Sequence, residues 1–128
     1  MTMHFTKTKN HYPVEDYLKK QEKYEFYCSL YRKLHSTFED IERNERVVEA
    51  YSTSNRIAWK RSQVFAEFHV CKTKLTIHMT KPINNPKMFG ENIPPTHNWH
   101  QLNWKCELTK FEDIDYIAEL INQSYEQN

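Results

Sequence analysis

Residues 102–125 are LNWKCELTKFEDIDYIAELINQSY, and this stretch decides the fold. Apolar and polar residues alternate strictly from Leu102 to Leu108, which predicts a strand with one buried face. Thr109 and Glu112 have the spacing of a capping box, in which two side chains bond free backbone N–H groups at a helix start. Apolar residues then recur at helical spacing as far as Tyr125. We therefore expect an amphipathic helix that folds back on the sheet.

Three further strands are predicted upstream of this unit, at residues 56–60, 64–70 and 75–79. Short turns separate them, which is typical of an antiparallel meander. The region just before them is ambiguous, because Val47 and Val48 fit either a helix or the start of a short strand. In the second strand we expect one set of alternate residues to face the core: Val64, Ala66, Phe68 and Val70. The opposite set is expected to face outward: Phe65, Glu67 and His69.

The N-terminal part is predicted to be a tail followed by helix. Residues 1–12 contain few apolar anchors, and we interpret them as a tail or an irregular lead-in. Pro13 suits the first position of a helix, and the apolar residues that follow recur mostly three or four apart. That spacing predicts one long helix, or two helices with a break near Lys23. We expect residues 13–128 to form a single two-layer α+β domain, with a mainly antiparallel sheet of about four strands. The N-terminal helical segment and the C-terminal helix are expected to pack on one face of this sheet.

The composition excludes several classes of protein. The chain has 128 residues, which fits one domain, and Gly90 is its only glycine, so a Gly-rich phosphate loop is excluded. A formal net charge of +1 gives no overall attraction to nucleic acid or to an acidic membrane surface. No apolar run has the length of a membrane span. The three cysteines are far apart in sequence and suggest reduced thiols in the cytoplasm.

Four segments together resemble the DUF5655 family, a domain of unknown function. They are residues 57–61 (IAWKR), 65–68 (FAEF), 74–79 (KLTIHM) and 111–125 (FEDIDYIAELINQSY). The resemblance covers about residues 30–125 and implies an accessory or binding role. Family members occur alone or as C-terminal modules of larger proteins, some of them nuclease-like or otherwise associated with DNA. The family's loop before the last strand usually has a His followed by glycines. Here the matching sequence HNWHQ at 97–101 has the His without the glycines.

The loop of residues 81–101 supplies the enzymatic and metal-binding alternative. This loop and the neighbouring predicted strands and turns hold six residues of the types that zinc prefers: His69, Cys71, His78, His97, His100 and Cys106. It has no closely spaced cysteine pair and no HExxH helix, and Cys106 shares its predicted strand face with apolar residues, as a core thiol does. We therefore predict no metal, no cofactor and no catalytic residue. A small enzyme or metal-binding protein that uses the His97/His100 loop is the alternative.

The outward face of the predicted sheet supplies the leading binding hypothesis. Cations interleaved with an aromatic ring are what single-stranded nucleic acid binding uses, and this face is expected to carry both. Glu67 and Glu107 dilute its positive charge, and an ordinary solvated sheet face has a similar composition. Together with the loop, the candidate ligand-binding residues are His97, Trp99, His100, Arg56, Lys60, Phe65, His69, His78 and Lys105.

We accordingly expect a cytoplasmic accessory or binding module without catalysis, with nucleic acid as the leading ligand class and no membrane association. A protein partner, including a second copy in a homodimer, is the other alternative. It is suggested by aromatic and apolar residues in the 81–101 loop, since such residues are favoured interface anchors. They are Met88, Phe89, Ile93 and Trp99. The same loop residues equally fit a loop that folds back onto its own core.

Overall fold

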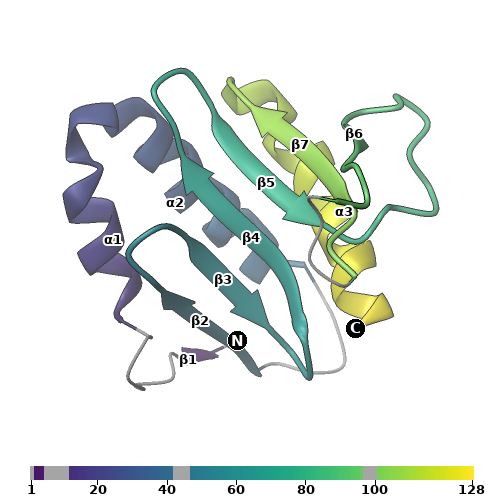
Figure 1. Ribbon diagram of the computed structural model, residues 1–128, viewed down its shortest axis with the longest axis horizontal. Coiled ribbons are helices and arrows are strands. Elements are labelled where there is room, and N and C mark those ends of the chain that lie inside the picture. The colour runs from purple at the N-terminus through teal and green to yellow at the C-terminus, as the bar shows by residue number, and fades with distance from the viewer. Residues whose placement is uncertain (1, 5–11, 42–46, 97–100) are drawn as a thin grey trace.

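A seven-stranded sheet forms one layer of the protein (Figure 1). The structure is a computed structural model that describes residues 2–4, 12–41, 47–96 and 101–128. The strand order is β1-β2-β3-β4-β5-β7-β6; β1 runs parallel to β2, and every other neighbouring pair is antiparallel. The strands are β1 (Thr2–His4), β2 (Val47–Ser52), β3 (Ile57–Lys60), β4 (Val64–Val70), β5 (Leu75–Met79), β6 (Glu91–Asn92) and β7 (Trp104–Leu108).

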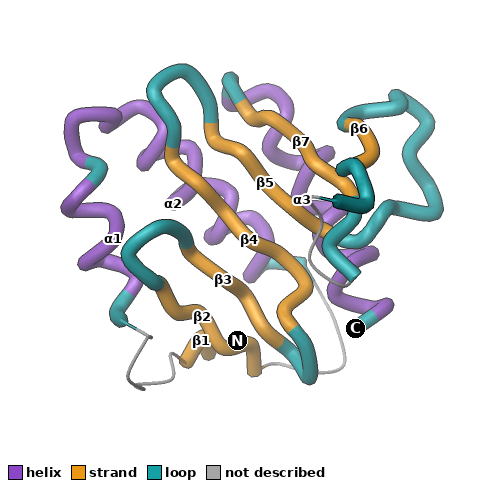
Figure 2. Tube along the Cα trace, in the orientation of Figure 1, coloured by secondary structure: helices purple, strands orange, loops and turns teal. Residues whose placement is uncertain are grey.

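The helices form the second layer, and all of them lie on one side of the sheet (Figures 1 and 2). They are α1 (Val14–Lys20), η1 (Glu22–Tyr24), α2 (Glu25–Glu39), η2 (Phe111–Asp113) and α3 (Ile114–Gln127), where η1 and η2 are short 3₁₀ helices. The predicted break near Lys23 corresponds to η1, which separates α1 from α2. α2 and α3 pack on each other and on the central strands, while α1 lies against β2. On the opposite face of the sheet, called the outer face below, no helix of the described residues lies.

The two-layer α+β architecture was predicted, but the strand count of about four was too low. The four predicted strands correspond to β3, β4, β5 and β7. β2 was ambiguous in sequence because its residues VVEAYS do not alternate strictly, and β6 has only two residues inside a proline-rich loop. β1 lies within the range that we interpreted as a tail, of which residues 1 and 5–11 lie outside the described residues.

The C-terminal unit forms the strand and the helix that its pattern indicated. In β7, Trp104, Cys106 and Leu108 are buried and alternate with more exposed residues. The helix begins differently from the predicted capping box. Within this described stretch a 3₁₀ turn leads into α3, and neither η2 nor α3 has a side-chain cap hydrogen bond at its start.

Phe65 contradicts its predicted outward position. Trp59 of β3 pairs with Ala66 of β4, whereas the next residue, Lys60, pairs with Val64, so Phe65 is the extra residue of a β-bulge. A bulge interrupts the alternation of side chains along a strand. As a result Phe65 is fully buried, and its ring lies 5.8 Å from that of Phe38 on the helical layer.

Large aromatic side chains fill the space between the layers. Trp59 is fully buried, and its indole N–H donates to the hydroxyl of Tyr31 at 3.0 Å. The rings of Phe38 and Phe68 lie 4.8 Å and 4.4 Å from it. Such rings bury large apolar areas, which explains how a chain of modest hydrophobicity forms a core. Among the described residues, no helix is long and apolar enough to cross a membrane.

Candidate functional site

The outer face brings together polar side chains that are far apart in sequence. Glu67 of β4 pairs directly with His78 of β5, and His78 pairs with Lys105 of β7, so the three form one row across three strands. His69 lies two residues after Glu67 and therefore on the same face of β4. Arg56, just before β3, reaches Glu67 from the other side. We call these five residues the outer-face cluster.

Glu67 is the most buried charged group of the cluster. It is only 5% exposed although it points away from the core. Burial raises the pKa of its carboxyl, and the positive charge of Arg56 opposes that rise. Arg56 Nε lies 2.8 Å from Glu67 Oε2, but its N–H is not aligned for a regular hydrogen bond. The carboxylate and the guanidinium thus form a close ion pair, which holds the pKa of Glu67 down against its burial.

The two histidines of the cluster are neutral near pH 7. Their ring centroids are 5.4 Å apart. Burial lowers the pKa of His78 to about 4, with further contributions from His69, Lys105 and Arg56. Burial and Arg56 also lower the pKa of His69, which hydrogen-bonds the backbone of Asn55. A neutral imidazole keeps a lone pair, so these rings can accept a hydrogen bond or ligate a metal.

A metal-ligand set lies within this cluster. The ligand atoms of Glu67, His69 and His78 all lie within 4.8 Å of one another. Two imidazoles and one carboxylate are a ligand set used for zinc and for non-haem iron.

A hollow adjoins the cluster on the side of β6 and β7. It has a volume of about 420 Å³ and is lined by His78, Glu91, Asn92, Ile93, Pro94 and Lys105. Gly90 holds this wall against the sheet with a positive φ of 97°. A Cβ atom there would lie against Trp104 and only 2.7 Å from the carbonyl oxygen of Lys105. Only glycine suits such a close approach, so the position of β6 depends on this residue.

The structure sorts the sequence candidates into three groups. Arg56, His69, His78 and Lys105 do come together on the outer face, and Lys60 lies at the far end of β3, paired with Glu49 and Val64. Phe65 was wrongly assigned to this face and belongs to the core because of the bulge. His97, Trp99 and His100 lie outside the described residues.

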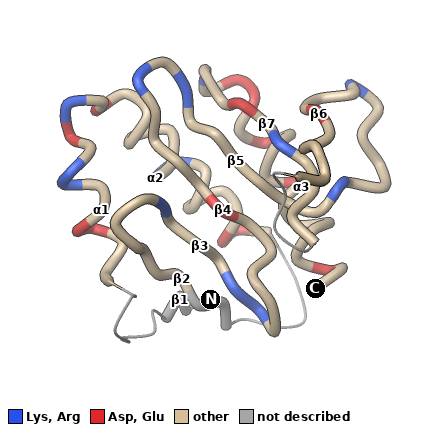
Figure 3. The backbone as a smooth tube through the Cα atoms, in the orientation of Figure 1, with Lys and Arg blue, Asp and Glu red and all other residues tan. Residues whose placement is uncertain are grey.

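Glu67 is the central residue that the sequence reasoning did not select. It was considered only as a charge that dilutes the basic face. The signal that identifies it is the alternation of Glu67 and His69, combined with a register that places His78 opposite Glu67. In Figure 3 the acidic segment in the middle of β4 lies between basic segments on β3, on β7 and at the β4–β5 turn.

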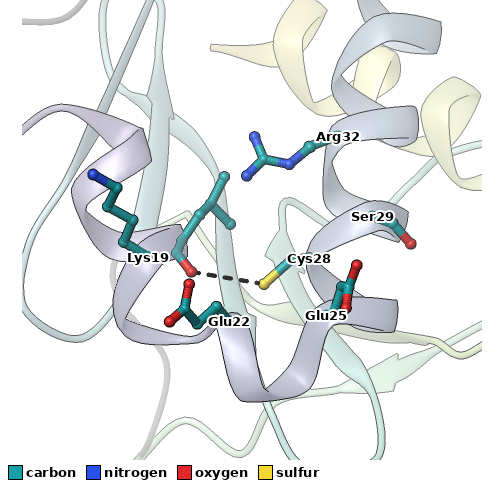
Figure 4. A pocket seen from close by; sticks show the side chains of 7 residues that line it. Lys19, Glu22, Glu25, Cys28, Ser29 and Arg32 are labelled. Carbon is teal, nitrogen blue, oxygen red and sulfur yellow. Dashed lines mark hydrogen bonds between the residues drawn. The ribbon is translucent and has the colours of Figure 1, made fainter.

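A second hollow, of about 490 Å³, lies between α1, η1 and α2 (Figure 4). Its charged groups have opposite signs, and Arg32 is bound by Glu15 at 2.7 Å. The thiol of Cys28 points to the backbone carbonyl of Leu18 at 3.9 Å. Burial raises the pKa of that thiol, which keeps it protonated and unreactive. This hollow is therefore a weaker candidate for a functional site than the outer-face cluster.

The comparisons with known proteins assign a family and no activity. A family model described as "Domain of unknown function (DUF5655)" matches residues 14–128. The match agrees with the resemblance seen in the sequence and extends it to α1. No curated protein and no solved structure gave a significant match.

Proposed function

This chain belongs to the DUF5655 family, whose description assigns no activity, and we propose a function for it from the geometry of its outer face. The protein is a cytoplasmic binding module without catalysis that holds phosphate-bearing ligands, with nucleic acid as the leading class. One observation carries this proposal. Arg56, His69, His78 and Lys105 come together on a sheet face that no helix of the described chain covers.

Phosphate contacts are the chemistry that suits this face. Arginine and lysine attract phosphate oxygens, and neutral imidazoles add hydrogen bonds. Lys105 Nζ lies 4.0 Å from both Glu91 and Glu107, a separation at which an exposed ion pair is weak, so it stays available to a ligand. An open sheet face also suits an extended single strand, as in other sheet-based RNA-binding modules.

The position of Phe65 defines the kind of binding expected. With its ring in the core, it is not available for base stacking. Attraction to phosphates then dominates, so binding should be insensitive to base sequence and sensitive to salt. Three cations, Arg56, Lys60 and Lys105, predict a slope of log K against log salt of roughly −2, at about −0.7 per phosphate. The dissociation constant should rise roughly 15-fold between about 50 mM and about 200 mM salt.

The buried thiols are poor candidates for a catalytic nucleophile. Burial raises the pKa of Cys106 to about 12, and the side chain is fully buried. A thiol in that state is a weak nucleophile. The three cysteines are free thiols, in keeping with the cytoplasmic location that we propose.

Fluorescence anisotropy with labelled single-stranded DNA and RNA tests the proposal. The double variant Lys60→Glu/Lys105→Glu should weaken binding at least tenfold and reduce the salt slope. Lys33→Glu, a charge change of the same kind on the exposed side of α2, is the matched control and should have little effect. Inorganic phosphate as competitor separates a free-phosphate site from one that needs the polynucleotide backbone. The proposal fails if neither nucleic acid binds at tens of micromolar, or if the control weakens binding as much as the double variant.

A protein partner is a second candidate because two apolar side chains of the 81–101 loop are exposed. Ile83 is 85% exposed and Met88 is 83% exposed. Ile93, by contrast, is buried, and Phe89 packs against the core, so this part of the loop does fold back. Light scattering after size exclusion distinguishes the 15.6 kDa monomer from a dimer. If Ile83 and Met88 form an interface, Ile83→Ser/Met88→Ser should dissociate the dimer without unfolding the chain.

A further inference from the structure

We propose that Glu67, His69 and His78 bind one divalent transition-metal ion, of the zinc class, at the centre of the outer face. The inference goes beyond phosphate binding and does not depend on it. It rests on three side chains from two adjacent strands whose ligand atoms lie within 4.8 Å of one another.

The backbone fixes the positions from which these ligands project. Glu67 and His78 are direct cross-strand partners. His69 lies two residues further along β4 and pairs with Thr76. Side chains two residues apart on a strand share a face, so all three project to the same side. β4 and β5 are central strands, flanked by β3 and β7, which keeps their separation constant. Ligands on a sheet of this kind are positioned more rigidly than ligands on a loop.

The spacing is close to what one ion requires. Zinc bonds nitrogen and oxygen at about 2.0–2.2 Å, so two ligand atoms on the same ion are at most about 4 Å apart. The observed limit of 4.8 Å therefore calls for side-chain movements of less than about an ångström for each ligand. Changes of rotamer supply such movements without moving the backbone.

The cluster has one carboxylate, Glu67, that attracts a cation, whereas Arg56 and Lys105 oppose one. The hydrogen bond of His69 to the backbone of Asn55 orients its ring, as supporting groups do in metal sites. A buried carboxylate also gains from a positive ion beside it. Arg56 supplies part of that charge, although its N–H is not well aligned with Glu67.

Arg56 is consequently a competitor of the metal. Both need the carboxylate of Glu67, and the guanidinium repels a second cation at this distance. Removing the guanidinium should strengthen metal binding. This expectation separates a metal site from a purely structural polar cluster, in which Arg56 could only help.

The three ligands also leave positions open on the ion. Zinc sites with three protein ligands keep a fourth position for water or another ligand. The hollow of about 420 Å³ begins at His78, so an open position on that side would face it. A water molecule or an anion held near Lys105 would complete the coordination.

Calorimetric titration of untagged protein with Zn²⁺, and absorption spectroscopy with Co²⁺, test the site. The wild-type chain should bind one equivalent at micromolar protein, and Co²⁺ should give visible bands. Glu67→Gln and His78→Gln should each weaken binding at least tenfold, while Arg56→Gln should strengthen it severalfold. His35→Gln, on α2 in the other layer, is the matched histidine control and should bind like wild type.

Circular dichroism melts verify that each variant is folded, and Glu67→Gln is the mildest change if His78→Gln fails that check. The proposal is overturned if wild-type protein takes up no metal. It is equally overturned if folded Glu67→Gln binds as tightly as wild type, because the ion would then lie at other residues. None of these measurements involves nucleic acid, so loss of phosphate binding and loss of the metal site are told apart.

Discussion

The replacement of Phe65 by alanine tests the fold at its least expected point. The Phe65 ring is fully buried and lies 5.8 Å from Phe38, 5.3 Å from Tyr125 and 6.3 Å from Trp59. The hydroxyl of Ser124 donates to the Phe65 carbonyl at 2.6 Å, which fixes the bulged backbone to α3. Alanine leaves a cavity here, because the strand is held on both sides and cannot collapse into the space.

A fully buried phenylalanine loses about 3–5 kcal/mol of unfolding free energy when it is truncated to alanine. The total stability of a domain is about 5–15 kcal/mol, so the change removes a large fraction of it. With a urea m-value of about 2 kcal/mol/M, the unfolding midpoint should fall by roughly 2 M. Urea titration followed by tryptophan fluorescence measures this shift.

Phe111→Ala is the matched control, because Phe111 is 48% exposed on η2 and its ring meets the exposed Phe26 ring edge-on at 5.7 Å. It should cost about 1 kcal/mol or less. If Phe65→Ala costs no more than this control, Phe65 lies on the outer face after all. The bulge and the description of the outer face would then both be wrong.

Three further predictions concern the rest of the chain. Gly90→Ala should destabilise the protein by about 1 kcal/mol or more, because its Cβ would clash with Trp104 in a left-handed backbone; a thermal melt like that of wild type would contradict this. Burial lowers the pKa of His35, so the folded state binds fewer protons there, and unfolding free energy should fall as pH drops below about 6.5. A proton NMR titration should give a midpoint for His35 below that value, and His35→Gln should reduce the dependence while His69 and His78, whose pKa values are also lowered, keep the rest. A His35 midpoint at or above about 6.5 would refute this prediction. In the native protein, alkylation followed by mass spectrometry should modify Cys71 well before Cys106, whose thiol is fully buried with a pKa raised to about 12, and equal rates would count against this core.

Local patterns were sufficient for the elements whose side chains alternate regularly. β7 and α3 follow from their apolar spacing because each buries a single face. The start of α3 was not predictable in the same way. Thr109 and Glu112 have capping-box spacing, yet the chain continues through a 3₁₀ turn before the helix begins. Spacing alone does not specify which backbone conformation enters a helix.

The bulge at Phe65 could not be predicted from β4 alone. It arises because β4 inserts one extra residue between two successive pairs with β3, and that mismatch belongs to the pairing of both strands. A phenylalanine at an outward position of an amphipathic strand was a sign of the conflict. In the structure the Phe65 ring is buried in the core, so the outer face lacks the aromatic ring that was predicted for it.

The pairing at the centre of the outer-face cluster could be predicted from the sequence once the turn between β4 and β5 was placed. Cys71 N–H donates to the Lys74 carbonyl at 2.9 Å and closes the turn between β4 and β5, so Val70 pairs with Leu75. Counting outward from that pair places Glu67 opposite His78. The charge of Glu67 alone does not indicate this relation, because it depends on the pairing of β4 with β5.

The central claim is that the outer face is the binding surface, and an NMR titration tests it most directly. Backbone amide signals of ¹⁵N-labelled protein are followed while a short single-stranded oligonucleotide is added at low salt. The proposed function predicts shifts concentrated on β4, β5 and β7, strongest at Glu67, His69, His78 and Lys105, which fade as salt is raised. Shifts confined to the hollow between α1 and α2, or none at saturating oligonucleotide, would contradict it.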